Sequence, residues 1–166
     1  MSLENMLIAE EKVKQDLMAK FGLAEDKFLI QRSRRITVDI PTQMFDSVFA
    51  YATHELGFVI LCTITGLDGD ATMEFIYHIA RENGIILNIR IHISKDSLVL
   101  KTISGQFPAA DIYERELADL LGVKVEGLKK GSRYPLPDGW PEGNYPLRKD
   151  WKKEMLDKKE AGHGTA

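Results

Sequence analysis

The chain has 166 residues, of which 44% are hydrophobic, which suits one globular domain with a core and a modest tail. Its 22 Lys and Arg residues nearly match its 25 Asp and Glu residues, giving a net charge of -3. This balance excludes the basic field with which proteins bind nucleic-acid phosphates, so no nucleic-acid partner is expected.

The N-terminal part of the chain predicts a helix and a hairpin. Apolar residues recur at helical spacing over residues 3–21, and Gly22 follows them as a stop. Residues 27–30 and 35–40 are predicted to be short strands, and residues 31–34 can connect them as a hairpin.

A second helix is predicted to begin at Pro41, because the fixed backbone angle of proline suits the first helical position. Its apolar stripe ends at Gly57, and His54 points away from that stripe. We therefore interpret His54 as a solvent-exposed residue.

Three β-rich segments follow and predict a meander, because turn signals separate them. They cover residues 58–67, 72–80 and 85–94. Strict alternation in the third segment predicts one buried face and places His92 on the other, solvent-facing side. A further short strand is predicted over residues 97–103.

The single cysteine, Cys62, excludes a disulfide within the chain and indicates a reducing compartment. It lies in the apolar run that begins at Phe58, so we interpret it as a buried small hydrophobe. Iron–sulfur clusters normally need several cysteine ligands, and the histidines are too scattered along the chain to have the spacing of metal ligands. No metal or cofactor is therefore expected in this chain.

The order of these elements predicts an α+β fold of two layers, with helices packed on one face of a mostly antiparallel sheet. We expect a globular domain over residues 1–126 and an extended tail over residues 127–166. The sequence has no phosphate-binding loop and no nucleophile elbow. No segment approaches the ~20 apolar residues of a membrane span, so we expect a cytoplasmic protein without direct membrane insertion.

A third helix is predicted over residues 108–122, with Asp111 and Glu114 spaced as a capping box and Gly122 as a stop. Its predicted apolar face consists of Ile112, Tyr113, Leu117, Leu120 and Leu121.

Glu116 projects into the middle of that apolar face, where an unpaired carboxylate would cost roughly 3–5 kcal/mol if it were buried. It has a partner, lies at a solvent-exposed rim or stays protonated, and the sequence does not choose between the first two. A catalytic role for Glu114 with Glu116 ranks below both, because residues two apart on a helix face different directions. Arg115 and Asp119 have the spacing of an ion pair on the edge of the face.

The tail carries most of the prolines of the chain, which block regular structure. It also carries aromatic residues, which are scarce in disordered linkers. These residues are Tyr134, Trp140, Tyr145 and Trp151. The tail can wrap its own domain, lie across a partner protein or act as a loose linker, and its composition favours the partner. The charged residues Arg148, Lys149 and Asp150 are candidates for ion pairs across such an interface.

Four ordered segments carry a family resemblance, namely residues 107–110, 114–122, 136–140 and 146–150. Together they resemble the 30 kDa subunit family of respiratory-chain NADH dehydrogenase, an enzyme that is also called NADH-quinone oxidoreductase. The short length and the run from Ile112 to Glu116 resemble more closely the corresponding subunits of energy-converting group 4 hydrogenases.

The resemblance implies a non-catalytic, cofactor-free subunit in the peripheral arm of a membrane-bound electron-transfer complex. Its partners would be the large subunit, of the 49 kDa or nickel–iron hydrogenase type, and a neighbouring iron–sulfur subunit. Iron–sulfur, nickel–iron or quinone groups would belong to those partners, on the cytoplasmic side of the membrane. The alternative from another class is a free-standing α+β ligand-binding or regulatory module that forms a homodimer.

The resemblance also assigns residues. The signature helix would carry Glu114, Arg115, Glu116, Asp119 and Gly122. The tail that docks on the partner would carry Arg148, Lys149 and Asp150. Together with the other candidates in the tail, the predicted docking residues are Tyr134, Trp140, Tyr145, Pro146, Leu147, Arg148, Lys149 and Asp150. The electron donor and acceptor, the branch of the family, the coupling ion and the oligomeric state stay open.

Overall fold

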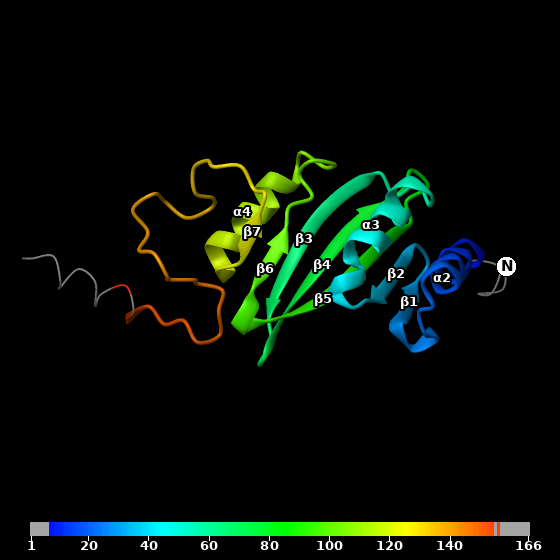
Figure 1. Cartoon of the computed structure of the whole chain (residues 1–166), viewed down its shortest axis with the longest axis horizontal. Helices are drawn as coiled ribbons and strands as arrows, with labels where there is room; N and C mark the ends of the chain where they lie inside the picture. The colour runs from blue at the N-terminus through cyan, green and yellow to red at the C-terminus, as the bar shows by residue number, and fades with distance from the viewer. Residues whose placement is uncertain (1–6, 155, 157–166) are drawn as a thin grey trace, which may run out of the picture. The chain divides into compact units, whose positions relative to one another are not determined.

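The computed structural model describes residues 7–154 and residue 156 (Figure 1). The chain clusters into two compact units, which we describe separately. Unit 1 comprises Met1–Thr65 and Glu74–Ile93, and unit 2 comprises Gly66–Met73 and Ser94–Ala166. The predicted helix residues 3–6 lie outside the described part of the chain.

Unit 1 is built on a five-stranded sheet in the order β1-β2-β5-β4-β3. The strands are β1 (Phe28–Arg32), β2 (Arg35–Asp39), β3 (Ile60–Asp68), β4 (Thr72–Ala80) and β5 (Ile86–Ser94). β1 and β2 form the predicted antiparallel hairpin, whereas β2 and β5 are parallel. The connections from β3 to β4 and from β4 to β5 are too short for parallel crossovers, so these pairs are antiparallel. The predicted α+β fold with a mostly antiparallel sheet is confirmed.

Two helices accompany this sheet, α2 (Ile8–Phe21) and α3 (Phe45–His54), and α3 runs along the strands (Figure 1). Phe45 of α3 packs on Tyr77 of β4 with ring centroids 4.4 Å apart. Tyr77 is 1% exposed, and Leu87 and Ile89 of β5 are fully buried. Each such buried side chain contributes roughly 1.5–3 kcal/mol, so this face of the sheet forms the core.

The opposite face of the sheet carries a row of hydrogen-bonded polar side chains. The His78 ring lies between two polar side chains. Its Nε2 is 3.0 Å from the Thr65 hydroxyl oxygen, and its Nδ1 is 2.8 Å from Asn88 Oδ1. Asn88 in turn donates to the hydroxyl of Thr37 at 3.1 Å. The row therefore connects β3, β4, β5 and β2 through satisfied polar groups. His92 is exposed, as its place in the alternation predicted.

Two local predictions in unit 1 differ from the structure. Cys62 is exposed rather than buried. Its strand, β3, is an edge strand of the sheet, and Ile60, at the start of the same strand, is also 47% exposed. The second helix starts with a 3-10 turn, η2 (Thr42–Met44), and α3 ends at His54, before the predicted stop at Gly57.

Unit 2 contains β6 (Val99–Lys101), α4 (Ala110–Leu121) and β7 (Lys124–Glu126), and β6 pairs with β7 in parallel. The helix α4 ends at Gly122, which has φ of 73° and confirms the predicted stop. β7 was not predicted, because its three residues are too few to show an alternation of apolar and polar positions. From residue 127 to residue 153 the structure describes turns and bends without a helix or strand, as the prolines predicted.

Candidate functional site

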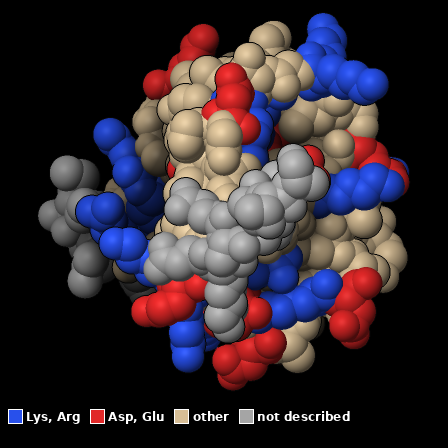
Figure 2. All heavy atoms as spheres, turned by 90° about the vertical axis from the view of Figure 1, so that its left-hand side faces the viewer, with Lys and Arg blue, Asp and Glu red and all other residues tan. Residues whose placement is uncertain are grey.

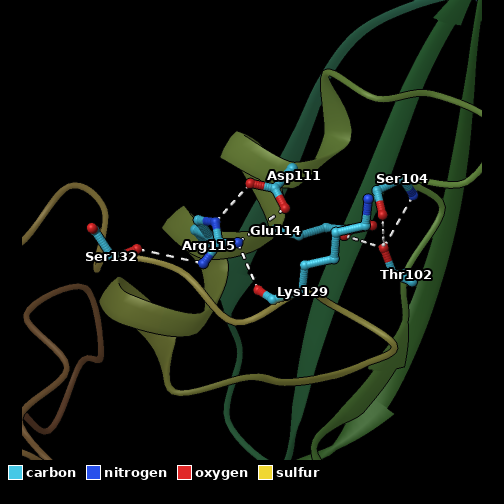
Figure 3. Close-up of polar contacts among 7 residues, drawn as sticks. All are labelled: Thr102, Ser104, Asp111, Glu114, Arg115, Lys129 and Ser132. Atoms are coloured by element: carbon cyan, nitrogen blue, oxygen red, sulfur yellow. Dashed lines mark hydrogen bonds and ion pairs between the residues drawn. The ribbon is translucent and has the colours of Figure 1, made fainter.

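The most deeply buried carboxylate of α4 is Glu114, which is 1% exposed. The Thr102 hydroxyl donates to its Oε2 at 2.5 Å (Figure 3), and the Ile103 N–H donates to its Oε1 at 2.7 Å. Burial raises the pKa of Glu114 above its ordinary value, the two hydrogen bonds oppose that rise, and the charge of Asp111 adds to it. Glu114 thus ties α4 to the chain that follows β6.

The buried face of α4 differs from the predicted one. It contains Ala110, Glu114, Leu117 and Leu121, at helical spacing, together with Asp119. Ile112, predicted to be in the apolar face, is 52% exposed, and Glu116 is only half-buried. The helix is therefore rotated so that Glu114, not Glu116, is the carboxylate within the face.

The predicted capping box of α4 is wrong, because its N-cap is Ala109 and makes no side-chain hydrogen bond. Asp111 instead receives two hydrogen bonds from Arg115, at 2.6 and 3.1 Å. The Arg115 guanidinium lowers the pKa of Asp111. The predicted pair of Arg115 with Asp119 is also wrong, since Arg115 turns toward the N-terminal end of the helix.

Arg115 also fixes the main chain that follows β7 (Figure 3). Its Nη2 donates to the Lys129 carbonyl at 2.7 Å, and its Nη1 lies 3.4 Å from the Ser132 carbonyl. A β-carbon on Gly131 would come within 2.9 Å of the guanidinium nitrogens, so a larger residue there would have to displace the Arg115 guanidinium. One arginine therefore joins α4 to the start of the C-terminal segment.

Asp119 accepts a hydrogen bond from Arg133 Nε at 3.0 Å, and it is 9% exposed. Arg133 Nη1 also donates to the Trp140 carbonyl at 2.7 Å. The second carboxylate oxygen of Asp119, Oδ2, is buried without a hydrogen-bond donor among the described residues. Arg133 was not singled out from the sequence.

The C-terminal end of α4 is covered by the segment around Tyr145. The Arg148 Nε donates to the carbonyl of Leu121 at 2.8 Å, which satisfies one of the free carbonyls at the helix end. The Arg148 guanidinium also lies 4.9 Å from the centroid of the Tyr145 ring. Leu147 N–H donates to the Leu120 carbonyl at 3.1 Å. Arg148 therefore fixes the tail to its own helix.

The two tryptophans of the tail stack on each other, with centroids 6.2 Å apart. Trp140 Nε1 donates to the Asn144 carbonyl at 2.9 Å, and Pro146 is half-buried. Trp151 Nε1 is buried without a hydrogen-bond partner among the described residues. The tail therefore wraps its own unit at these positions, whereas its composition had favoured a partner protein.

Lys149 joins the tail to the turn between β3 and β4, within unit 2. Its N–H donates to Asp68 Oδ2 at 2.8 Å, and its Nζ lies 3.5 Å from Asp70. Asp68, with a side chain 3% exposed, also pairs with Lys95 at 2.6 Å. Burial opposes ionisation of Asp68, but Lys95 and the Lys149 N–H outweigh it and lower its pKa. The sequence had indicated only a turn at Asp68.

Three large apolar side chains of this part of unit 2 remain exposed. Tyr134 is 47% exposed, Leu147 is 57% exposed and Ile112 of α4 is 52% exposed. The acidic residue Asp150 is also exposed. These four residues have side chains available to another molecule.

The described residues contain no group of three or more His, Cys, Asp or Glu side chains able to hold a metal ion. No helix in the described part combines the length and the hydrophobicity required to cross a membrane.

Comparison with protein families decides the class of this chain. The family of the 30 kDa subunit of respiratory-chain NADH dehydrogenase matches residues 38–155. The chain belongs to this family. The match includes α4 and most of the C-terminal segment, so the resemblance in the sequence is confirmed.

Several proteins similar to this chain are named as subunits of a hydrogenase, a quinone oxidoreductase and a dehydrogenase. The chain is 43% identical over 83 residues to membrane-bound hydrogenase subunit beta of Pyrococcus furiosus, covering 48% of this chain and 47% of that protein. It is 29% identical to a subunit of the NADH-quinone oxidoreductase of Moorella thermoacetica, over 69% of this chain and 82% of that protein. It is 28% identical to a subunit of the F(420)H(2) dehydrogenase of Methanosarcina mazei, over 82% of this chain and 88% of that protein.

Solved structures agree with the fold. A chain of the membrane-bound sulfane sulfur reductase, an archaeal respiratory membrane complex, is 27% identical with a TM-score of 0.77, covering 94% of this chain and 93% of that chain. The trypsin-resistant fragment of Nqo5 is 23% identical with a TM-score of 0.63, covering 75% of this chain and 100% of the fragment, and supports the fold alone.

Proposed function

We propose that this chain is a non-catalytic subunit in the peripheral arm of a membrane-bound electron-transfer complex. The complex would be of the NADH:quinone oxidoreductase or energy-converting nickel–iron hydrogenase type. The names of the relatives support this class, since they are subunits of hydrogenase, quinone-oxidoreductase and F(420)H(2) dehydrogenase systems. The electron-carrying groups would belong to neighbouring subunits, because one cysteine cannot supply the ligands of an iron–sulfur cluster.

The observation that carries the docking role is the exposed Leu147 on a fixed backbone. Leu147 is 57% exposed, yet its N–H is bonded to α4 and the next residue, Arg148, is bonded to the helix end. An apolar side chain held outward by a fixed main chain loses little entropy when it enters a pocket of a partner. The partner we propose is the large subunit, of the 49 kDa or nickel–iron type, beside an iron–sulfur subunit.

We further propose that the chain is held at the cytoplasmic side of the membrane through these partners. Purification of the tagged chain from detergent-solubilised membranes of its own organism tests this proposal. We expect to recover the large subunit in equal amount, as identified by mass spectrometry. Recovery of the chain alone, or as a homodimer in the soluble fraction, would favour the free-standing module instead.

A matched pair of variants tests the contact itself. Leu147→Asp places a charge at the exposed position in the tail and should reduce the recovered large subunit about tenfold or more. Ile8→Asp is the control, because Ile8 is 63% exposed and lies on α2 of unit 1. Equal recovery of the large subunit with both variants would show that Leu147 of the tail is not part of the interface.

A further inference from the structure

A short basic loop follows β7 in unit 2. Residues 127–137 contain Lys129, Lys130 and Arg133 and no acidic residue. The Arg133 charge is met by Asp119, whereas Lys129 and Lys130 are exposed. Asp111 of α4, which lies within electrostatic range of Lys129, already accepts two hydrogen bonds from Arg115. Two positive charges are therefore left facing solvent.

The loop that carries these lysines is fixed in place. Arg115 binds the carbonyls of Lys129 and Ser132, at the two sides of Lys130. Gly131 allows this approach, because a β-carbon there would lie 2.9 Å from both terminal guanidinium nitrogens. The main chain is thus ordered by its own helix before any partner is bound, which lowers the entropy cost of binding.

Exposed apolar side chains occur in the loop and in the part of α4 that holds it. Ile112, one helical turn before Arg115, is 52% exposed, and Tyr134, directly after Arg133, is 47% exposed. Seen from the side of the C-terminal segment, uncharged surface is bordered by groups of Lys and Arg and by groups of Asp and Glu side chains (Figure 2). Apolar anchors with a charged rim are the usual composition of a protein interface.

We propose that Ile112, Lys129, Lys130 and Tyr134 form a preordered surface that binds an acidic, partly apolar face of a partner protein. The excess of positive charge in the loop selects an acidic face. A lipid surface is disfavoured, because basic segments that bind anionic membranes carry about 4–8 Lys or Arg together. The inference rests on the proposed function, with the large subunit as the partner.

Binding of the purified chain to the purified large subunit of the same organism, measured at low and high salt, tests this surface. The variant Lys129→Glu with Lys130→Glu should weaken binding about tenfold or more at low salt and reduce the salt dependence. Lys129→Arg with Lys130→Arg should bind as the wild type does. The control is Lys12→Glu with Lys27→Glu in unit 1, whose side chains are 73% and 51% exposed.

The outcomes separate this inference from the proposed function. If the wild type binds and the charge-reversed loop binds equally well, the surface is wrong and the proposed function stands. If the wild type does not bind the large subunit, both fail. The wild type can also be tested on vesicles of phosphatidylglycerol and phosphatidylcholine. If it binds them and the charge-reversed loop does not, the surface binds a membrane and the protein partner is wrong.

Discussion

The ring of Tyr145 packs against Gly122 so closely that a β-carbon on residue 122 would lie 2.4 Å from it. Gly122 is also the left-handed residue that ends α4, with φ of 73°. Gly122 therefore both ends α4 and provides the space that the Tyr145 ring occupies.

Gly122→Ala should consequently lower the free energy of unfolding more than the same substitution does at an ordinary helix stop. The left-handed backbone alone costs roughly 1–2 kcal/mol with a side chain, and displacement of the Tyr145 ring adds to it. Gly22→Ala is the matched control, because Gly22 ends α2 with φ of 64° and has open space around it. Urea unfolding measures both free energies. Equal losses would show that the ring contact carries no energy, and in a Tyr145→Ala background the cost of Gly122→Ala should fall toward that of Gly22→Ala.

Glu114 predicts a pH-dependent stability. Its pKa is raised in the folded chain, so the folded state holds the proton more tightly than the unfolded state does. The free energy of unfolding should therefore fall as the pH rises from the ordinary value of 4.5 through the folded pKa. Glu114→Gln cannot titrate and should lack this fall.

The comparison uses unfolding free energies of the wild type and Glu114→Gln at about pH 5 and about pH 8. The wild type should lose stability relative to the variant at the higher pH. Asp39, Asp68 and Asp111 have lowered pKa values, below 3.8, and therefore titrate outside this range. A pH-independent difference between the two proteins would contradict burial as the dominant influence on Glu114.

Local signals in the sequence predicted most elements of the fold. Gly22 and Gly122 ended helices as expected, because the left-handed stop depends only on neighbouring residues. The alternation of β5 predicted its buried face for the same reason. The parallel pairing of β2 with β5 was not predictable, since it depends on strands far apart in the chain.

The partners of the charged residues in the site were less predictable. Helical spacing allows Arg115 to pair with Asp111 or with Asp119 equally well. The choice is made by Arg133 of the tail, which takes Asp119 and leaves Asp111 to Arg115. Likewise, Glu114 is buried instead of Glu116 because Thr102 and Ile103 supply its hydrogen bonds. Each of these choices depends on a residue outside the helix.

His78 supplies a prediction for the sheet of unit 1. Its ring joins Thr65 to Asn88, so His78→Ala would leave polar groups of both without this partner. We expect a loss of about 1–3 kcal/mol in the free energy of unfolding. His92→Ala, at an exposed position of the same sheet, should change stability by less than about 0.5 kcal/mol. Similar losses in both variants would show that the row of hydrogen bonds is not stabilising.

Asp68 predicts how the tail is held at Lys149. Asp68→Ala removes the acceptor of the Lys149 N–H and the partner of Lys95, and it should cost about 1–3 kcal/mol. Amide hydrogen exchange at Lys149 should then become faster, because the acceptor of its N–H is gone. Asp70→Ala is the control, since Asp70 contacts the same lysine only through the exposed ammonium group. The pKa of Asp68 is lowered, so its stabilisation should be present above pH 3.8 and lost as the pH falls through the folded pKa. Unchanged exchange at Lys149 in Asp68→Ala would mean that other contacts, such as that of Arg148 with α4, hold this part of the tail.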